Sequence, residues 1–212
     1  MKQLLYLLVM GAMLSSCQPK DEHTYAEIET DFGTMKIMLY NTTPKHRDNF
    51  VKLAKEGFYD GLLFHRVMDG FMVQGGDPDS KNAAPGQMLG QGGPGYQIDP
   101  EIGSPHFKGA IAAARTQNPQ KLSSGSQFYV VQGQPIDDAY LDNIERQKNI
   151  KYNEQQRQMY KEVGGTPFLD NDYTVFGEVV EGMEVIDKIA KVQTDGNNRP
   201  LEDVRMQVRI LD

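Results

Sequence analysis

The chain has 212 residues, with 29 acidic and 22 basic side chains and a formal charge of −7. This length is enough for one ordinary domain with a sizeable core. Because phosphate binding needs a basic surface, the acidic balance argues against a nucleic-acid-binding protein.

Residues 1–16 have the pattern of an export signal. Lys2 supplies a positive start, and the apolar run that follows is too short for a stable membrane span. The run ends in Leu14-Ser15-Ser16 directly before Cys17, which resembles a bacterial lipoprotein signal. The alternative is an ordinary signal peptide with an incidental cysteine.

This resemblance implies that cleavage leaves Cys17 as the lipid-bearing N-terminus, so that the membrane becomes a partner through the lipid. Cys17 is the only cysteine, and we expect no disulfide in the mature chain. Residues 17–24 are polar and are predicted to form a tether. Gln18 directly after the cysteine favours sorting to the outer membrane of a bacterial cell envelope. Whether the protein would lie on the periplasmic side or the cell surface is not determined.

The first elements of the folded part are a hairpin and a helix. Residues 26–40 alternate about a turn at 31–33, as expected for two antiparallel strands. Thr43-Pro44 then predicts a helix start, with a capping hydroxyl before a proline at the first helical position. Gly57 is expected to end this helix.

The stretch FHRVMDGFMVQGGD (64–77) predicts two short strands around Gly70. It carries one arginine, Arg66, among apolar side chains. One interpretation is a surface charge, because most lone charges in strands face solvent. The other is a cation held beside an apolar pocket. A glycine-rich loop over 75–95 follows.

The remaining strands predict a mainly β fold. Many short strands with two helices in the body indicate a closed barrel or a sandwich. The segments are strands over 109–114, 126–132, 174–180 and 204–211, and a helix over 183–190.

Residues 134–167 interrupt this pattern with a predicted helical insertion. Apolar residues recur at helical spacing from Ile136 to Ile144. Asn153 and Gln156 form a capping-box pattern for a second helix, and Gly164-Gly165 ends it. We expect a helical hairpin on the barrel surface, used for partner or client selection, with a purely structural prop as the alternative.

Conventional catalytic motifs are poorly represented. The four histidines are scattered without metal-ligand spacing, and no serine lies in a nucleophile elbow. We therefore predict no metal and no cofactor.

Four separated motifs resemble the cyclophilin family of peptidyl-prolyl cis/trans isomerases, in the family's order. They are FHRVMDGFMVQGGD, GAIAAAR, SGSQFYV and FLDNDYTVFGEVVEGMEVIDKI. The resemblance covers residues 25–212, interrupted by 134–167. It implies a closed eight-stranded antiparallel β-barrel capped by two α-helices.

The resemblance also implies the site residues. Arg66 corresponds to the family's catalytic arginine. The substrate-binding positions correspond to Phe71, Met72, Gln74, Ala114, Arg115, Gln127, Tyr129, Phe168, Leu169 and Tyr173.

Four of these positions depart from common family residues. Arg115 stands where many relatives have asparagine, and Tyr173 replaces a histidine. Phe168 replaces the tryptophan of many eukaryotic members. Tyr129 replaces phenylalanine, which we expect to place a hydroxyl at the edge of the proline pocket.

The implied function is acceleration of rotation about X-Pro peptide bonds. The expected partners are proline-containing segments of unfolded or folding envelope proteins, bound by a monomer. Two other classes remain open: a non-catalytic proline-peptide-binding chaperone module, and a structural envelope lipoprotein with an idle barrel.

Overall fold

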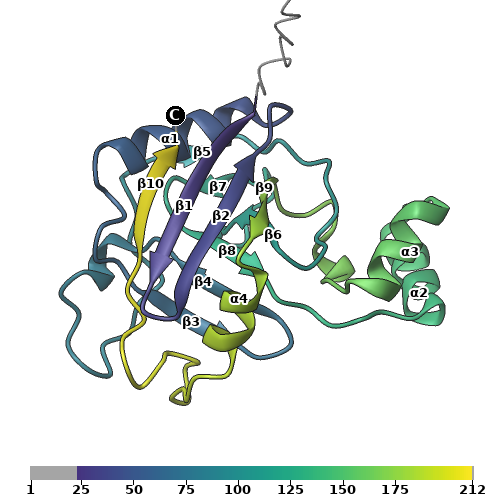
Figure 1. Cartoon of the computed structure of the whole chain (residues 1–212). Coiled ribbons are helices and arrows are strands. Elements are labelled where there is room, and N and C mark those ends of the chain that lie inside the picture. The colour runs from purple at the N-terminus through teal and green to yellow at the C-terminus, as the bar shows by residue number, and fades with distance from the viewer. Residues whose placement is uncertain (1–22, 212) are drawn as a thin grey trace, which may run out of the picture.

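The computed structural model describes residues 23–211, which fold around one curled antiparallel sheet (Figure 1). The strands and helices in chain order are β1 (Thr24–Thr30), β2 (Gly33–Leu39), α1 (Pro44–Lys55), β3 (Phe64–Met68), β4 (Met72–Gly75), η1 (Pro78–Ser80), β5 (Gln97–Ile98), β6 (Ala110–Ala113), β7 (Ser123–Ser124), β8 (Phe128–Val131), α2 (Asp138–Lys148), α3 (Glu154–Glu162), η2 (Pro167–Leu169), β9 (Val175–Glu181), α4 (Met183–Ala190) and β10 (Gln207–Leu211). The main sheet has the order β10-β1-β2-β9-β6-β8-β4-β3. These eight strands with α1 and α4 are called the barrel body below.

Most elements of the barrel body follow the sequence pattern. The hairpin, the two strands around Gly70 and the helix over 183–190 are confirmed. The short strands β5 and β7 had no signal in the sequence. They pair with each other in a separate two-stranded sheet.

The prediction of a closed barrel is wrong, because the curled sheet is open. Strands β3 and β10 are its two edges and form no ladder with each other. Near them the chain forms an isolated bridge between Leu63 and Arg205 and a few backbone hydrogen bonds, among them Met206 N–H to the Leu62 carbonyl at 2.9 Å. The register between β3 and β4 shifts between Phe64 and Arg66. Such an irregularity interrupts the β3–β4 ladder and bends the strand.

The main core lies inside the curl and includes residues of both body helices. Phe50 and Leu53 of α1 and Ile186 and Ile189 of α4 belong to one cluster with the inward residues of the strands. Figure 1 shows α1 and α4 at opposite ends of the sheet. Each helix therefore covers one end of the apolar interior.

The start of α1 differs from the prediction of a threonine cap. Thr43 is the N-cap residue, but its hydroxyl donates to the carbonyl of Tyr40 at 3.3 Å and caps nothing. The carboxylate of Glu101 instead accepts the N–H groups of Lys45 (3.1 Å) and His46 (3.0 Å). A distant side chain thus satisfies the orphan donors of the first turn.

The insertion contains two helices, α2 and α3, which lie together at one side of the molecule (Figure 1). Asn153 and Gln156 form the predicted capping box. The insertion has its own apolar cluster, built around Leu141, Ile144, Tyr152 and Tyr160 and packed against Phe107. It therefore packs against the body through a small core of its own.

The two ends of the insertion meet at glycines. Gly133 and Gly165 have φ values of +61° and +155°, which favour glycine. A Cβ on Gly133 would lie 2.6 Å from the Cα of Gly165, and a Cβ on Gly165 would lie 2.2 Å from the carbonyl oxygen of His106. This crossing leaves no room for a side chain.

Residues 1–16 and Cys17, on which the signal and lipid predictions rest, lie outside the described residues. From residue 23 to residue 211, no helix has both the length and the apolar character that crossing a membrane requires. The lipid anchor remains a prediction from sequence.

Candidate active site

Nine of the eleven positions assigned to catalysis and substrate binding line one pocket of about 90 Å³. These are Arg66, Phe71, Met72, Gln74, Ala114, Arg115, Tyr129, Leu169 and Tyr173. They come from β3, the turn before β4, β4, β8, η2 and the segments that follow β6 and precede β9. Segments that are far apart in the sequence therefore converge at a single site.

Strand alternation places this pocket on the face of the sheet opposite the core. Val73 and Val130 belong to the main core cluster. Their neighbours Met72 and Tyr129 belong to a second cluster that includes pocket residues. Because successive side chains point to opposite faces, one set of strands serves both the core and the pocket.

The pocket has a buried base and a partly exposed rim. Met72 and Tyr129 are almost fully buried. Phe71, Leu169 and Tyr173 are partly exposed and pack against the same cluster. An apolar ring entering here would lose contact with water while leaving its attached chain outside.

Arg66 lies at the side of this apolar pocket and is half-buried. Its guanidinium donates to Gln74 Oε1 at 3.3 Å and to Met68 Sδ at 3.3 Å. These two bonds use only part of its fixed set of N–H groups. A permanently charged donor therefore borders the space that a ligand would fill, and the surface-charge interpretation of Arg66 is not favoured.

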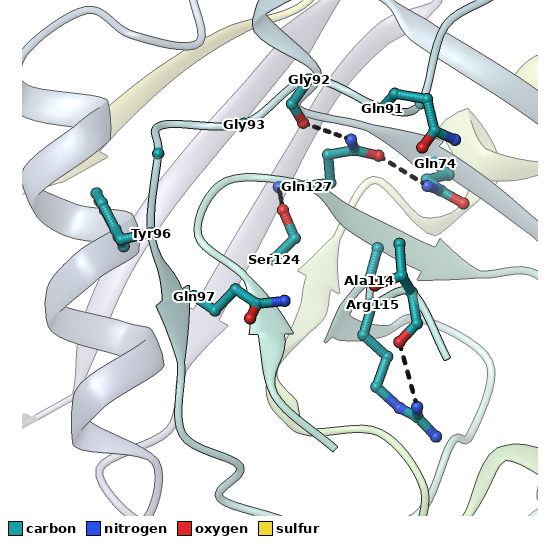
Figure 2. A pocket seen from close by; sticks show the side chains of 13 residues that line it. Gln74, Gln91, Gly92, Gly93, Tyr96, Gln97, Ala114, Arg115, Ser124 and Gln127 are labelled. Carbon is teal, nitrogen blue, oxygen red and sulfur yellow. Dashed lines mark hydrogen bonds between the residues drawn. The ribbon is translucent and has the colours of Figure 1, made fainter. Parts of the chain in front are cut away.

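A line of amides runs from Gln74, a hydrogen-bond partner of Arg66, into a second, larger groove of about 650 Å³ (Figure 2). Gln74 Nε2 donates to Gln127 Oε1 at 3.1 Å, and Gln127 Nε2 donates to the carbonyl of Gly92 at 2.7 Å. Gln127 lines this groove and does not line the smaller pocket. The buried carboxylate of Asp77 fixes the loop by accepting the N–H groups of Gly90 and Gly92.

Ala114 and Arg115 form the wall shared by the pocket and the groove. Both peptide groups of Ala114 are bonded within the chain, its N–H to Gln127 O (2.9 Å) and its carbonyl to Ser124 N (2.8 Å). Among residues 23–211, Arg115 has no backbone–backbone bond. Its side chain donates to the carbonyl of Asp172 at 2.9 Å and so is held at the wall.

Phe168 lies at the rim and is not one of the residues that line the pocket. Its side chain is 41% exposed, and its ring centroid is 5.4 Å from that of Phe71. It therefore extends the apolar surface of the pocket outward.

The hydroxyl of Tyr129 is not at the pocket edge, contrary to expectation. It lies 3.0 Å from Nε2 of His106, which is fully buried. Burial, followed by the nearby Tyr173 and the charge of Asp170, raises the pKa of Tyr129 well above its ordinary value. The hydroxyl therefore stays protonated and forms a hydrogen bond with His106 Nε2.

Sequence reasoning missed His106 and Asp170 behind the pocket. His106 Nδ1 lies 2.8 Å from Asp170 Oδ1. The only local signal is that Asp170 follows Leu169 within the FLDNDYTVFG stretch. Nothing in the sequence indicates that His106 pairs with it.

This arrangement suits binding of a peptide with one apolar ring. The pocket takes the ring, the amide line and groove offer hydrogen bonds to a chain, and Arg66 offers a charged donor beside the ring. Within the described residues, no group of three or more His, Cys, Asp or Glu side chains is placed to hold a metal ion.

Comparisons with known proteins agree with this geometry. The family described as "Cyclophilin type peptidyl-prolyl cis-trans isomerase/CLD" matches residues 25–209. A protein from Staphylococcus saprophyticus, assigned by name to the peptidyl-prolyl cis-trans isomerases, is 34% identical over 180 residues. The match covers 84% of this chain and 86% of that protein.

Solved structures share the fold. The cyclophilin-type isomerase of Cryptosporidium parvum superposes with a TM-score of 0.67 at 23% identity, covering 90% of this chain and 98% of that one. A second crystal structure of that protein, in the presence of the dipeptide Ala-Pro, has a TM-score of 0.65 at 23% identity and covers 89% and 99% of the two chains. With the family match over nearly the whole described chain, these results show that the chain belongs to the cyclophilin-type peptidyl-prolyl cis-trans isomerases.

Proposed function

We propose that Arg66 is the catalytic residue of this isomerase and acts on an X-Pro bond whose proline ring fills the 90 Å³ pocket. The observation that carries the proposal is the position of Arg66 in the same pocket as the apolar side chains of Phe71, Met72 and Leu169. The Cryptosporidium parvum structure obtained with Ala-Pro supports a proline-containing ligand for the shared fold.

The chemistry needs a donor rather than a nucleophile. Resonance gives the peptide C–N bond partial double-bond character and a rotation barrier of about 18–20 kcal/mol. In the twisted transition state, the imide nitrogen regains its lone pair and accepts a hydrogen bond. A guanidinium in a partly desolvated site stabilises that state more than the planar ground state.

The other pocket residues would hold the substrate in place. Phe71, Met72, Tyr129 and Leu169 would grip the proline ring through apolar contact. Gln74 and the peptide group of Arg115 would bond the flanking chain. Phe168 would extend the contact at the rim.

The test compares Arg66→Ala with wild type by exchange NMR on a short peptide containing one Ala-Pro bond. This method reports both the isomerisation rate and the dissociation constant. We expect the rate to fall by roughly two to three orders of magnitude, with a much smaller change in affinity. Arg66→Lys should also be slow, because an ammonium cannot reproduce the planar fork.

Arg209→Ala provides the matched control, since Arg209 is an exposed arginine of β10. It should behave as wild type. Near-normal exchange in Arg66→Ala would remove the catalytic assignment. A wild-type chain that binds the peptide without accelerating exchange would instead be a non-catalytic proline-binding module.

We further propose that the protein assists folding in a bacterial cell envelope, held there by a lipid on Cys17. The support is the sequence: an apolar run ending in Leu-Ser-Ser before that cysteine. Residues 17–24 would serve as the tether, and the outer membrane is the favoured site. Cys17→Ser should move the protein from the membrane to the soluble fraction, or leave its signal uncleaved. Identical fractionation of the two forms would contradict the anchor.

A further inference from the structure

A chain of buried polar groups links the base of the proline pocket to the helical insertion. The Tyr129 hydroxyl bonds His106 Nε2 (3.0 Å), and His106 Nδ1 bonds Asp170 Oδ1 (2.8 Å). Asp170 Oδ2 accepts the hydroxyls of Tyr152 (2.7 Å) and Tyr160 (2.6 Å). These five residues are called the junction network, and each is buried.

The members of the junction network come from four segments, of which His106 occupies the one that precedes β6. Tyr129 lies on β8 and lines the pocket. Asp170 directly follows η2, whose last residue, Leu169, is a pocket wall. Tyr152 and Tyr160 belong to the insertion. The network is therefore the place where pocket base, pocket wall and insertion meet.

The bonding within the network is complete at its centre. The backbone N–H of His106 also donates to Asp170 Oδ1 at 2.8 Å, so four donors converge on one carboxylate. Burial, then the charge of Asp170, raises the pKa of both Tyr152 and Tyr160. Both hydroxyls stay protonated, and each can donate to Asp170. A buried carboxylate with this set of partners has one preferred geometry.

A second tie holds the same wall from the insertion side. Lys148, in the last turn of α2, donates to the carbonyl of Asp170 (2.7 Å) and to the carboxylate of Asp172 (2.5 Å). On the groove side, Arg115 donates to the carbonyl of Asp172 and lies 4.7 Å from the ring centroid of Tyr173. The segment 170–173 is thus fixed from both sides.

We propose that the insertion is a positioning element of the proline pocket, with Tyr152 and Tyr160 acting through Asp170 and His106 on Tyr129 and Leu169. This inference rests on the proposed function of the pocket. It differs from both roles that the sequence left open for the insertion, client selection and a passive prop. The insertion holds the base and one wall of the pocket in the arrangement that fits a proline ring.

Arg66 is outside the network, and its guanidinium forms hydrogen bonds with Gln74 and Met68. Loosening the network should therefore weaken peptide binding more than it slows isomerisation of the bound peptide. We expect Tyr152→Phe with Tyr160→Phe to weaken binding of a short Ala-Pro peptide by about tenfold, because a shifted wall loses contact with the ring. Exchange at saturating peptide should stay within about twofold of wild type.

The matched control is Tyr140→Phe, which removes an exposed hydroxyl from α2 of the same insertion. It should leave both the dissociation constant and the exchange rate unchanged. The full chain is used throughout, and circular dichroism establishes that each variant is folded at the assay temperature.

A double-mutant cycle separates positioning from general weakening. Tyr129→Phe breaks the last link of the network from the pocket side. If Tyr160 acts on the pocket through His106, the double variant Tyr129→Phe/Tyr160→Phe should lose less binding free energy than the sum of the losses in the two single variants. ¹⁵N NMR of the His106 ring should show a protonated Nδ1 in wild type and a shifted signal in Tyr160→Phe.

Two results would overturn the inference. One is a dissociation constant for Tyr152→Phe/Tyr160→Phe equal to that of Tyr140→Phe. The other is strict additivity in the cycle with an unchanged His106 signal. These differ from failure of the proposed function, in which wild type itself would not accelerate exchange or Arg66→Ala would exchange normally.

Discussion

The barrel body and the junction network are stabilised in different ways. In the barrel body, Phe128 packs its ring against Phe50 and Tyr59, with centroids 5.5 and 5.7 Å away. In the junction network, four polar side chains are buried together with the carboxylate of Asp170. Apolar packing is non-directional and is shared among many neighbours, whereas each buried hydrogen bond depends on one partner in one place.

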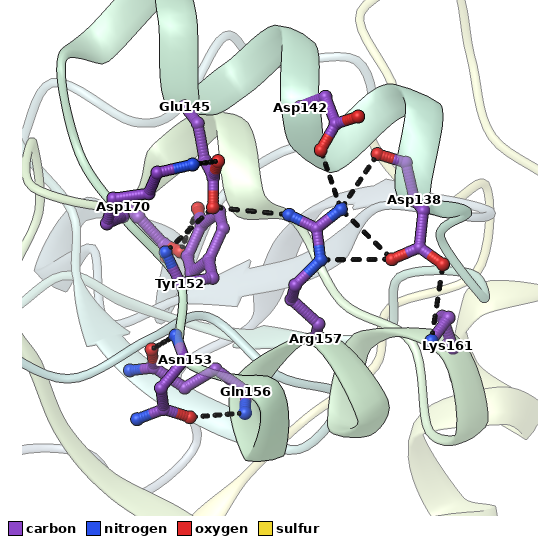
Figure 3. Close-up of polar contacts among 10 residues, drawn as sticks. Asp138, Asp142, Glu145, Tyr152, Asn153, Gln156, Arg157, Lys161 and Asp170 are labelled. Carbon is purple, nitrogen blue, oxygen red and sulfur yellow. Dashed lines mark hydrogen bonds and ion pairs between the residues drawn. The ribbon is translucent and has the colours of Figure 1, made fainter.

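This contrast predicts different responses to substitution. A lost apolar group should weaken the whole cooperative unit of the barrel body. A lost polar partner should instead loosen the insertion and the pocket wall, because local openings need less free energy than global unfolding. The insertion's own ion pairs (Figure 3), in which Arg157 reaches Asp142 at 2.7 Å, are part of this second region.

The largest effect is expected for Phe128→Ala, which would empty the centre of the main core. The free energy of unfolding should fall by about 3–5 kcal/mol, since a buried phenylalanine is lost and a cavity is left. Urea unfolding followed by circular dichroism measures the change. A fall below about 1 kcal/mol would show that the core repacks and would break the comparison.

Asp170→Asn should have a smaller and more local effect. An amide cannot accept hydrogen bonds from all the donors that converge on the carboxylate, so polar groups without a partner remain buried. Their cost should lower stability by roughly 1–3 kcal/mol. Hydrogen exchange should become faster in α2, α3 and η2 and stay unchanged in β1 and β2. Asp142→Asn, at an exposed residue of α2, serves as the control. Uniformly faster exchange across β1 and β2 would contradict a separate junction.

Glu101→Gln should weaken the barrel body only slightly. The neutral amide still accepts one of the two helix N–H bonds at the start of α1 but no longer carries a negative charge. We expect the free energy of unfolding to fall by about 1 kcal/mol or less. The urea midpoint of this variant is compared with that of Asp99→Asn, whose side chain is exposed. Equal midpoints in the two variants would show that the Glu101 carboxylate does not stabilise the start of α1.

The smallest effect is a pH dependence from His46. Burial lowers the pKa of His46 in the folded protein below its ordinary value of 6.5, although Glu101 acts in the opposite direction. The neutral form therefore contributes stability that is complete above pH 6.5 and is lost as the pH falls toward the folded pKa. Unfolding free energies between about pH 7.5 and about pH 5.5 should decline, with a smaller slope in His46→Gln. An unchanged slope would assign the dependence to other groups.

The sequence by itself determined the elements that local physics controls. The hairpin alternates with period two about a glycine turn, and α4 has its apolar residues at helical spacing. The capping box of Asn153 and Gln156 needs only residues three apart. The site positions came from the resemblance of the four motifs to the cyclophilin family, and nine of the eleven do share one pocket.

Only the tertiary structure decided which distant groups meet. The sheet is open because β3 and β10 form no ladder with each other, and no residue pattern indicates this. Glu101, 55 residues away from His46, replaces the hydroxyl of Thr43 at the start of α1. His106 and Asp170 are 64 residues apart, and their pairing turns the Tyr129 hydroxyl away from the pocket edge. A hydrogen bond is directional and short, so its partner is fixed by the folded positions of two segments and not by the sequence around either one.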